Sequence, residues 1–131
     1  MFIVLEGIDG VGKTYLAKKL GEELQRRGKK VSYHFEPCLL RKEILEGTFS
    51  RIGDLFLFFA DRILHSPIIK EDMEQNDYVI CDRYYPSNYA YQIAPVIDDG
   101  SNFIYNTLFN KMEAAFDLHL LSIPHPTVIF H

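Results

Sequence analysis

Apolar and polar positions along this chain alternate between two patterns. Residues 2–6 form a short apolar run without strict alternation, which is typical of a central parallel strand covered on both faces. Residues 14–27 carry leucines at four-residue spacing, which predicts an amphipathic helix. Gly28 stands where the C-terminal cap of this helix is expected. The same reasoning predicts further strands at 30–35, 78–81 and 127–130.

Weaker periodicity predicts the remaining helices. They are expected over 41–45, 54–65, 66–76 and 102–121, and another begins within 87–92. Asp54 is the predicted N-cap of the second of these helices. Ser66 and Pro67 resemble an N-cap followed by a first-turn proline, so the pattern predicts a separate helix there.

Strands that alternate with helices predict an α/β fold with a central parallel sheet between two helical layers. The length of 131 residues predicts one domain spanning 1–131. In such sheets, ligands bind beyond the carboxyl ends of the strands. The first and third predicted strands both have unusual polar residues at that end, which makes this edge the candidate site.

Charge and composition limit the classes of ligand. The chain has 14 Lys plus Arg against 18 Asp plus Glu, a formal net charge of -4, which argues against binding long nucleic acid. A small anionic ligand remains compatible with this balance. No apolar run approaches the length of a membrane span, and no secretory signal is found. Cys38 and Cys81 are expected as reduced thiols, so we expect a cytoplasmic protein.

A glycine-rich turn follows the first strand. Its sequence GIDGVGKT, residues 7–14, fits the phosphate-binding pattern G-x-x-x-x-G-K-[ST] in full. Glycines let successive backbone N–H groups point at phosphate oxygens, and the helix N-terminus adds its dipole. Lys13 would reach the outer phosphates of ATP, and the Thr14 hydroxyl would ligate Mg²⁺. The candidate phosphate-binding residues are Gly7, Asp9, Gly10, Val11, Gly12, Lys13 and Thr14.

Two polar residues at the end of the third strand extend this chemistry. Asp82 is placed to orient Mg²⁺ or its water, and Arg83 could clamp a phosphate with two hydrogen bonds. The structural alternatives are a strand-end cap for Asp82 and a surface ion pair for Arg83. The loop alone does not separate a kinase from a nucleotide switch, a motor or a binding module, so other residues must decide.

Four segments resemble thymidylate kinases, in the order found in that family. They are FIVLEGIDGVGKT at 2–14, LFFADRILH at 57–65, ICDRYYPSNYAYQ at 80–92, and the strand at 124–130. The resemblance implies a P-loop kinase fold, transfer of phosphate from ATP to dTMP with Mg²⁺, and a homodimer. It also implies catalytic roles for Lys13, Asp82 and Arg83.

The resemblance further implies an acceptor site. Asp9 would meet the sugar 3′-hydroxyl, and Arg83 would hold the acceptor phosphate. Phe58 would stack on thymine and Arg62 would hydrogen-bond it. From the residues alone, however, Phe58 is expected as a core side chain. Arg62 follows it by four residues, a spacing that suits a stack and a hydrogen bond to one base and equally suits an arginine stem lying over a phenylalanine.

The later part of the resemblance completes the predicted acceptor pocket. Ser87 and Asn88 would line the base pocket. Tyr91 would pack on the base or close the space at the sugar 2′ position, and Gln92 would be a nearby polar wall. By itself, Tyr91 would be interpreted as packing.

The chain departs from the family pattern around its Glu-Pro pair. The family commonly has arginine before the pair, whereas this chain has Phe35. Glu36 is still expected on the acceptor side, with a turn carboxylate as the alternative. A phosphate-binding arginine follows in the family, and Arg41 and Arg51 are both candidates, of which Arg41 is preferred.

Family members are substantially longer and carry an arginine-bearing lid after the last strand predicted here. We therefore expect either a fragment of a longer enzyme, which the apolar final strand favours, or a short form with impaired transfer. The alternatives are a deoxynucleoside kinase and a nucleotide-binding protein without transfer. The histidines at 34, 65, 119, 125 and 131 lack zinc-ligand spacing and are expected to be structural or solvated.

Overall fold

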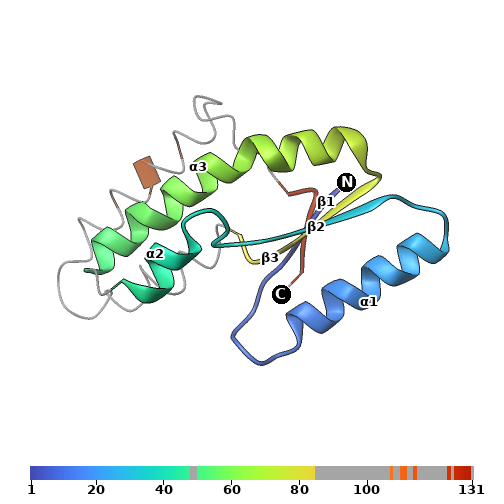
Figure 1. The fold of residues 1–131 in the computed structure, drawn as a ribbon, viewed down its shortest axis with the longest axis horizontal. Helices are drawn as coiled ribbons and strands as arrows, with labels where there is room; N and C mark the ends of the chain where they lie inside the picture. Colours follow the sequence, from blue (N-terminus) through green and yellow to red (C-terminus); the bar gives the residue numbers. More distant parts are fainter. Residues whose placement is uncertain are drawn as a thin grey trace.

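The computed structural model describes residues 1–47, 50–84, 107, 110, 111, 114, 124 and 126–130, except for the side chains at 51 and 52. Its elements, in chain order, are β1 (Phe2–Leu5), α1 (Lys13–Arg26), β2 (Val31–Phe35), α2 (Arg41–Glu46), α3 (Arg51–Gln75), β3 (Tyr78–Asp82) and β4 (Val128–Phe130) (Figure 1). Each predicted strand and the first two predicted helices are confirmed to within one or two residues.

The four strands form one sheet in the order β2-β3-β1-β4, and every neighbouring pair is parallel. The register places Leu5 of β1 beside Asp82 of β3, and Phe35 of β2 beside the same Asp82. The carboxyl ends of three strands therefore meet at one edge, as the sequence pattern predicts.

The helices α1 and α3 cover opposite faces of the sheet (Figure 1). Phe2 and Val4 of β1 belong to a buried cluster with Leu55 and Phe59 of α3. The intervening Ile3 and Leu5 of β1 instead belong to a cluster with Ala17 of α1. Because successive strand side chains point to opposite faces, β1 must be apolar throughout. This arrangement confirms the predicted three-layer α/β architecture.

The start of α3 differs from the prediction. The N-cap is Ser50, whose hydroxyl accepts a hydrogen bond from the backbone N–H of Gly53 at 3.1 Å. Asp54, the predicted cap, lies instead in the first turn, where its negative carboxylate interacts favourably with the positive end of the helix dipole. Both residues are good caps by type, and the hydroxyl four residues earlier takes the position.

The predicted break at Ser66 and Pro67 is also wrong, because α3 continues through both. A proline in a helix interior removes one hydrogen bond and costs about 3 kcal/mol. The Ser66 hydroxyl donates to the carbonyl of Arg62 at 2.7 Å. Leu55 and Ile69, on either side of the proline, are both fully buried in the core. Burial along the whole helix thus offsets the local cost of the proline.

Other local predictions agree with the structure where the described residues test them. Gly28 has φ of +77°, so it adopts the left-handed conformation expected after the end of α1. Cys38 and Cys81 are free thiols, and Cys81 is buried as expected. Residues 107, 110, 111 and 114 are helical, in keeping with the helix predicted over 102–121. The rest of that helix and the one predicted from 87 lie outside the described residues. Within the described residues, every helix is too short or too polar to cross a membrane.

Candidate functional site

The loop between β1 and α1 is built on glycines with positive φ. Gly7, Gly10 and Gly12 have φ of 147°, 83° and 90°. A Cβ on Gly7 would lie 3.2 Å from a side-chain methyl carbon of Val11, which is closer than ordinary van der Waals contact. The carbonyl of Gly12 accepts the N–H of Leu16 at 2.9 Å and so begins α1. The sequence thus forms a tight bend that ends at a helix N-terminus, a favourable place for a phosphate.

Two residues at the start of α1 face the predicted site. The Lys13 ammonium donates to the carbonyl of Ile8 at 2.8 Å, so it spans the loop. The Thr14 hydroxyl donates to Oδ2 of Asp82 at 2.8 Å. The loop and the end of β3 are therefore joined directly, although 68 positions separate the two residues.

Asp82 presents an oxygen that the described residues leave unused. Its Oδ1 is buried without a hydrogen-bond partner among them, while Oδ2 accepts from Thr14. A carboxylate and a hydroxyl are hard oxygen donors of the kind that Mg²⁺ prefers. The residues at this position therefore fit the metal that the sequence predicts.

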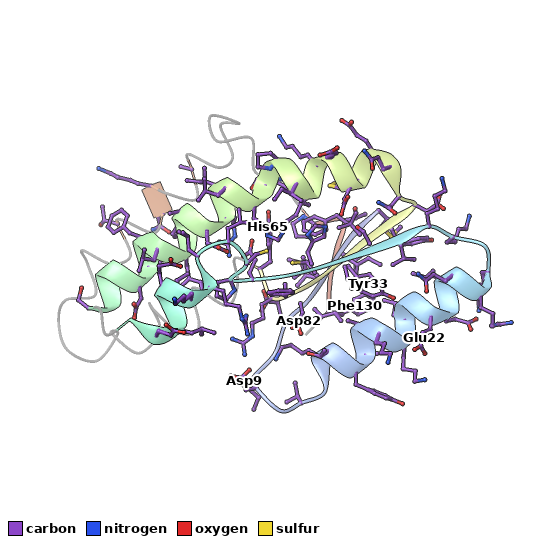
Figure 2. All side chains as sticks on the ribbon, in the orientation of Figure 1. Asp9, Glu22, Tyr33, His65, Asp82 and Phe130 are labelled. Carbon is purple, nitrogen blue, oxygen red and sulfur yellow. The ribbon has the colours of Figure 1, made fainter. Side chains whose placement is uncertain are left out.

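Arg83 turns from the end of β3 toward the loop. Among the described non-glycine residues, only Arg83 has a positive φ, at +69°. This left-handed conformation costs about 1 kcal/mol or more. Its Nη2 forms an ion pair with Oδ1 of Asp9. Figure 2 shows Asp9 on the loop close to Asp82 at the end of β3. The strained backbone thus brings a cation to the same edge as Asp82.

These residues open onto a cleft of about 1030 Å³. Of the predicted site residues, the cleft is lined by Asp9, Gly10, Gly12, Lys13, Thr14, Glu36, Arg41, Asp82 and Arg83. A cleft of this size suits a ligand as large as a nucleotide. Its lining combines cations from several elements with carboxylates at the strand ends, as a site for phosphates and a metal requires.

Glu36 and Arg62 form a buried ion pair beside the cleft. Arg62 donates from Nε to Oε2 of Glu36 at 3.0 Å and from Nη2 to the same oxygen at 2.5 Å. The side chains are 3% and 1% exposed. Nη1 of Arg62 is buried without a partner among the described residues. Arg62 itself does not line the cleft as the described residues define it, so its predicted contact with the base remains a prediction.

The choice between Arg41 and Arg51 remains a prediction. Arg41 lines the cleft, its guanidinium lies 5.2 Å from the ring centre of Phe35, and its Nη1 donates to Pro37 at 3.4 Å. The side chain of Arg51 lies outside the described residues. Phe35, which stands where the family commonly has arginine, is half exposed, and its ring faces the Arg41 guanidinium.

The other predicted acceptor residues are not brought to the cleft by the described structure. Phe58 is partly buried on α3, one turn before Arg62, and it does not line the cleft as the described residues define it. Four predicted pocket residues lie outside the described residues: Ser87, Asn88, Tyr91 and Gln92. Their roles remain predictions.

Several buried polar residues escaped the sequence reasoning. Asp61 accepts the backbone N–H groups of Cys38 and Leu40 at 2.8 and 2.6 Å, which anchors the segment after β2. Glu6 accepts the N–H of Tyr84 at 2.7 Å, which ties the segment after β3 to the loop. The signal available in the sequence was the position of Asp61 inside an apolar stretch, which indicates a buried carboxylate that needs hydrogen-bond donors.

Two histidines were expected only as structural or solvated residues. His34 of β2 and His65 of α3 are in contact, with Nδ1 of the first 2.8 Å from Nε2 of the second. Nε2 of His34 lies 2.8 Å from Asp72. Nothing in the local sequence places these rings together, because they are 31 positions apart.

Comparisons with known proteins agree on one family. The family profile described as thymidylate kinase matches residues 5–115. A probable thymidylate kinase of Thermococcus kodakarensis is 40% identical over 114 residues, which cover 75% of this chain and 56% of the relative. One of Methanocaldococcus jannaschii is 40% identical over 112 residues, which cover 79% and 55%.

A solved structure gives the same answer for the fold. The crystal structure of thymidylate kinase from Ehrlichia chaffeensis superimposes with a TM-score of 0.77 and 31% identity, over 99% of this chain and 72% of that protein. The chain spans about half the length of the curated relatives that it matches.

Proposed function

Because this chain belongs to the thymidylate kinase family, we propose that it takes part in the transfer of the ATP γ-phosphate to dTMP, which gives dTDP. The observation that carries the proposal is the meeting of the glycine loop with the end of β3, through the Thr14–Asp82 hydrogen bond and the Arg83–Asp9 ion pair. These two contacts support a site in which the loop binds the phosphates of the donor and the end of β3 binds the phosphate of the acceptor.

The donor half of the site is the loop. Backbone N–H groups of residues 7–14 and the Lys13 ammonium would hold the phosphates of ATP. Mg²⁺, held by Thr14 and Asp82, would supply charge neutralisation between the phosphates. Lys13 leaves the carbonyl of Ile8 when a phosphate oxygen offers a stronger, charge-assisted hydrogen bond.

The acceptor half lies toward β2 and α3. Arg83 would hold the acceptor phosphate, and Asp9, its ion-pair partner, would lie within reach of the sugar. Arg41, which lines the cleft, and Arg62, whose buried Nη1 has no partner among the described residues, would be donors for the rest of the acceptor. The acceptor phosphate is already an anion, so it would attack the γ-phosphorus in line without a strong general base, as the bond to the bridging oxygen breaks and ADP leaves. Catalysis then consists of positioning and charge neutralisation.

A direct acceptor assay tests the proposal. The chain is incubated with ATP, Mg²⁺ and either dTMP or thymidine, and the products are separated by chromatography. We expect dTDP from dTMP and no product from thymidine. Phosphorylation of thymidine would instead identify a deoxynucleoside kinase. Calorimetric binding of ATP and dTMP without transfer would identify a nucleotide-binding protein and would contradict the proposal.

The family also leads us to propose a homodimer that acts in the cytoplasm. Light scattering coupled to size-exclusion chromatography measures the mass in solution. A mass of twice 15.2 kDa is the expected result, and a monomer over the accessible concentration range would contradict it.

A further inference from the structure

Four side chains form a continuous chain from the surface to the cleft. The carboxylate of Asp72 contacts Nε2 of His34 at 2.8 Å, and Nδ1 of His34 contacts Nε2 of His65 at 2.8 Å. Nδ1 of His65 then faces Oε1 of Glu36 at 3.8 Å. Figure 2 places His65 between α3 and the sheet. Asp72 is about one-third exposed, whereas His65 and Glu36 are buried.

The hydrogens of this chain can be counted from the contacts. Two neutral imidazoles carry two N–H hydrogens in total. One of them must lie between the rings, because two ring nitrogens at 2.8 Å require a donor and an acceptor. The second hydrogen then lies either on Nε2 of His34, facing Asp72, or on Nδ1 of His65, facing Glu36. The two carboxylates therefore compete for one hydrogen through the rings.

The geometry decides this competition. Asp72 is within hydrogen-bond distance of its nitrogen, whereas Glu36 is 3.8 Å from its nitrogen and already accepts from Arg62. The hydrogen thus lies on Nε2 of His34, and Nδ1 of His65 is a lone pair. This assignment explains why Nδ1 of His65 is buried without a hydrogen-bond partner among the described residues.

We propose that Asp72, through His34, makes His65 a positioning residue that leaves Glu36 bound to Arg62, and that a hydrogen on Nδ1 of His65 weakens acceptor binding. The second half rests on the proposed function, because it takes Arg62 as a donor to the acceptor. A hydrogen that lies instead on Nδ1 of His65 points at Oε1 of Glu36 and draws that carboxylate away from Arg62.

The charged and titratable surroundings of His65 come from every element packed against it. His34 on β2 and Glu36 after it face the ring of His65, and they are bound in turn by Asp72 and Arg62 on α3. Cys81 of β3 and Tyr84 after it lie near Glu36 and Arg62. Burial lowers the pKa of His34 below its usual 6.5, despite its bond to Asp72, so His34 is neutral at physiological pH. The pKa values of Cys81 and Tyr84 are raised, mainly by burial, so both stay uncharged.

Nitrogen-15 NMR of the imidazole rings tests the first half without any ligand. At pH about 8, above the ordinary histidine pKa of about 6.5, the wild type should show hydrogen on Nε2 of both rings. Asp72→Ala should move hydrogen to Nδ1 of His65 and shift the Nε–H resonance of Arg62. Asp72→Asn should resemble the wild type, because its amide oxygen still accepts. Glu74→Ala is the matched control, since Glu74 is an exposed carboxylate on the same helix.

Calorimetry tests the second half. Asp72→Ala should weaken dTMP binding by about 3- to 10-fold, the range of one hydrogen bond, and leave ATP binding unchanged. Asp72→Asn and Glu74→Ala should bind dTMP as the wild type does.

Each result decides the proposal. Hydrogen on Nδ1 of His65 in the wild type, or an unchanged tautomer in Asp72→Ala, overturns the relay. A changed tautomer with unchanged dTMP affinity overturns its effect on the acceptor. Absence of dTMP binding in the wild type is a failure of the proposed function instead. The Nε–H resonance of Arg62 then still reports whether the relay moves Glu36.

Discussion

Removal of the Glu36 carboxylate should destabilise the chain more than any exposed substitution. Glu36→Ala leaves the guanidinium of Arg62 buried, with a side chain that is 1% exposed and has lost its anionic partner. The rings of Tyr84 and Phe59, 4.8 and 5.8 Å from the guanidinium, offer only weak compensation. The charge must then draw in water or distort α3, and either response lowers the free energy of unfolding.

The magnitude follows from the geometry of the pair. Two hydrogen bonds of 3.0 and 2.5 Å are lost, together with the charge compensation for Arg62. Breaking a buried pair from one side costs about 3–5 kcal/mol. Small domains have a total stability of about 5–15 kcal/mol, so a large part of it should disappear. Glu36→Gln keeps one acceptor oxygen and should cost less than Glu36→Ala.

Urea unfolding followed by circular dichroism measures the effect in a double-mutant cycle. The variants are Glu36→Ala, Arg62→Met and the two together, with the exposed Glu46→Ala as a control that should change stability by no more than about 0.5 kcal/mol. We expect the double variant to be more stable than the sum of the single losses implies, because neither charge is then left alone. Strictly additive losses, or a loss below about 1 kcal/mol in Glu36→Ala, would refute the reasoning.

Three further predictions concern the site. Lys13→Ala should lower dTDP formation by about 100-fold or more, which corresponds to a few kcal/mol of transition-state stabilisation. Lys29→Ala is the control and should have no effect. Unchanged turnover in Lys13→Ala would contradict the assignment of the phosphate loop. Phe58→Ala should weaken dTMP binding far more than ATP binding, and the exposed Phe56→Ala should weaken neither; equal calorimetric losses for both ligands would indicate a core role for Phe58. The pKa of His34 is lowered mainly by burial. Below pH 6.5, His34 therefore binds a proton more readily in the unfolded chain than in the native chain. Stability should therefore fall on acidification through that range, and urea unfolding of His34→Gln should show a smaller fall.

Much of the fold could be predicted because it depends on local patterns. The continuous apolar sequence of β1 reflects burial on both faces, and the glycine loop can take few conformations other than a tight bend with positive φ. The meeting of Thr14 with Asp82 also followed from the sequence, because parallel strands bring their carboxyl ends to one edge. In contrast, the continuity of α3 through Pro67 was missed, since long-range burial outweighed the local signal.

The sequence by itself determined which residues stand at the ends of the strands: a glycine-rich loop that fits a phosphate-binding pattern after β1, and a carboxylate and an arginine at the end of β3. Only the tertiary structure decided which buried charges pair. Arg62 could reach a ligand, a ring or a carboxylate from its helix, and the approach of β2 supplied Glu36. His34, His65 and Asp72 likewise meet only because β2 packs beside α3. Local patterns are set by backbone geometry, whereas partners of long polar side chains are set by whichever group the folded chain brings within about 3 Å.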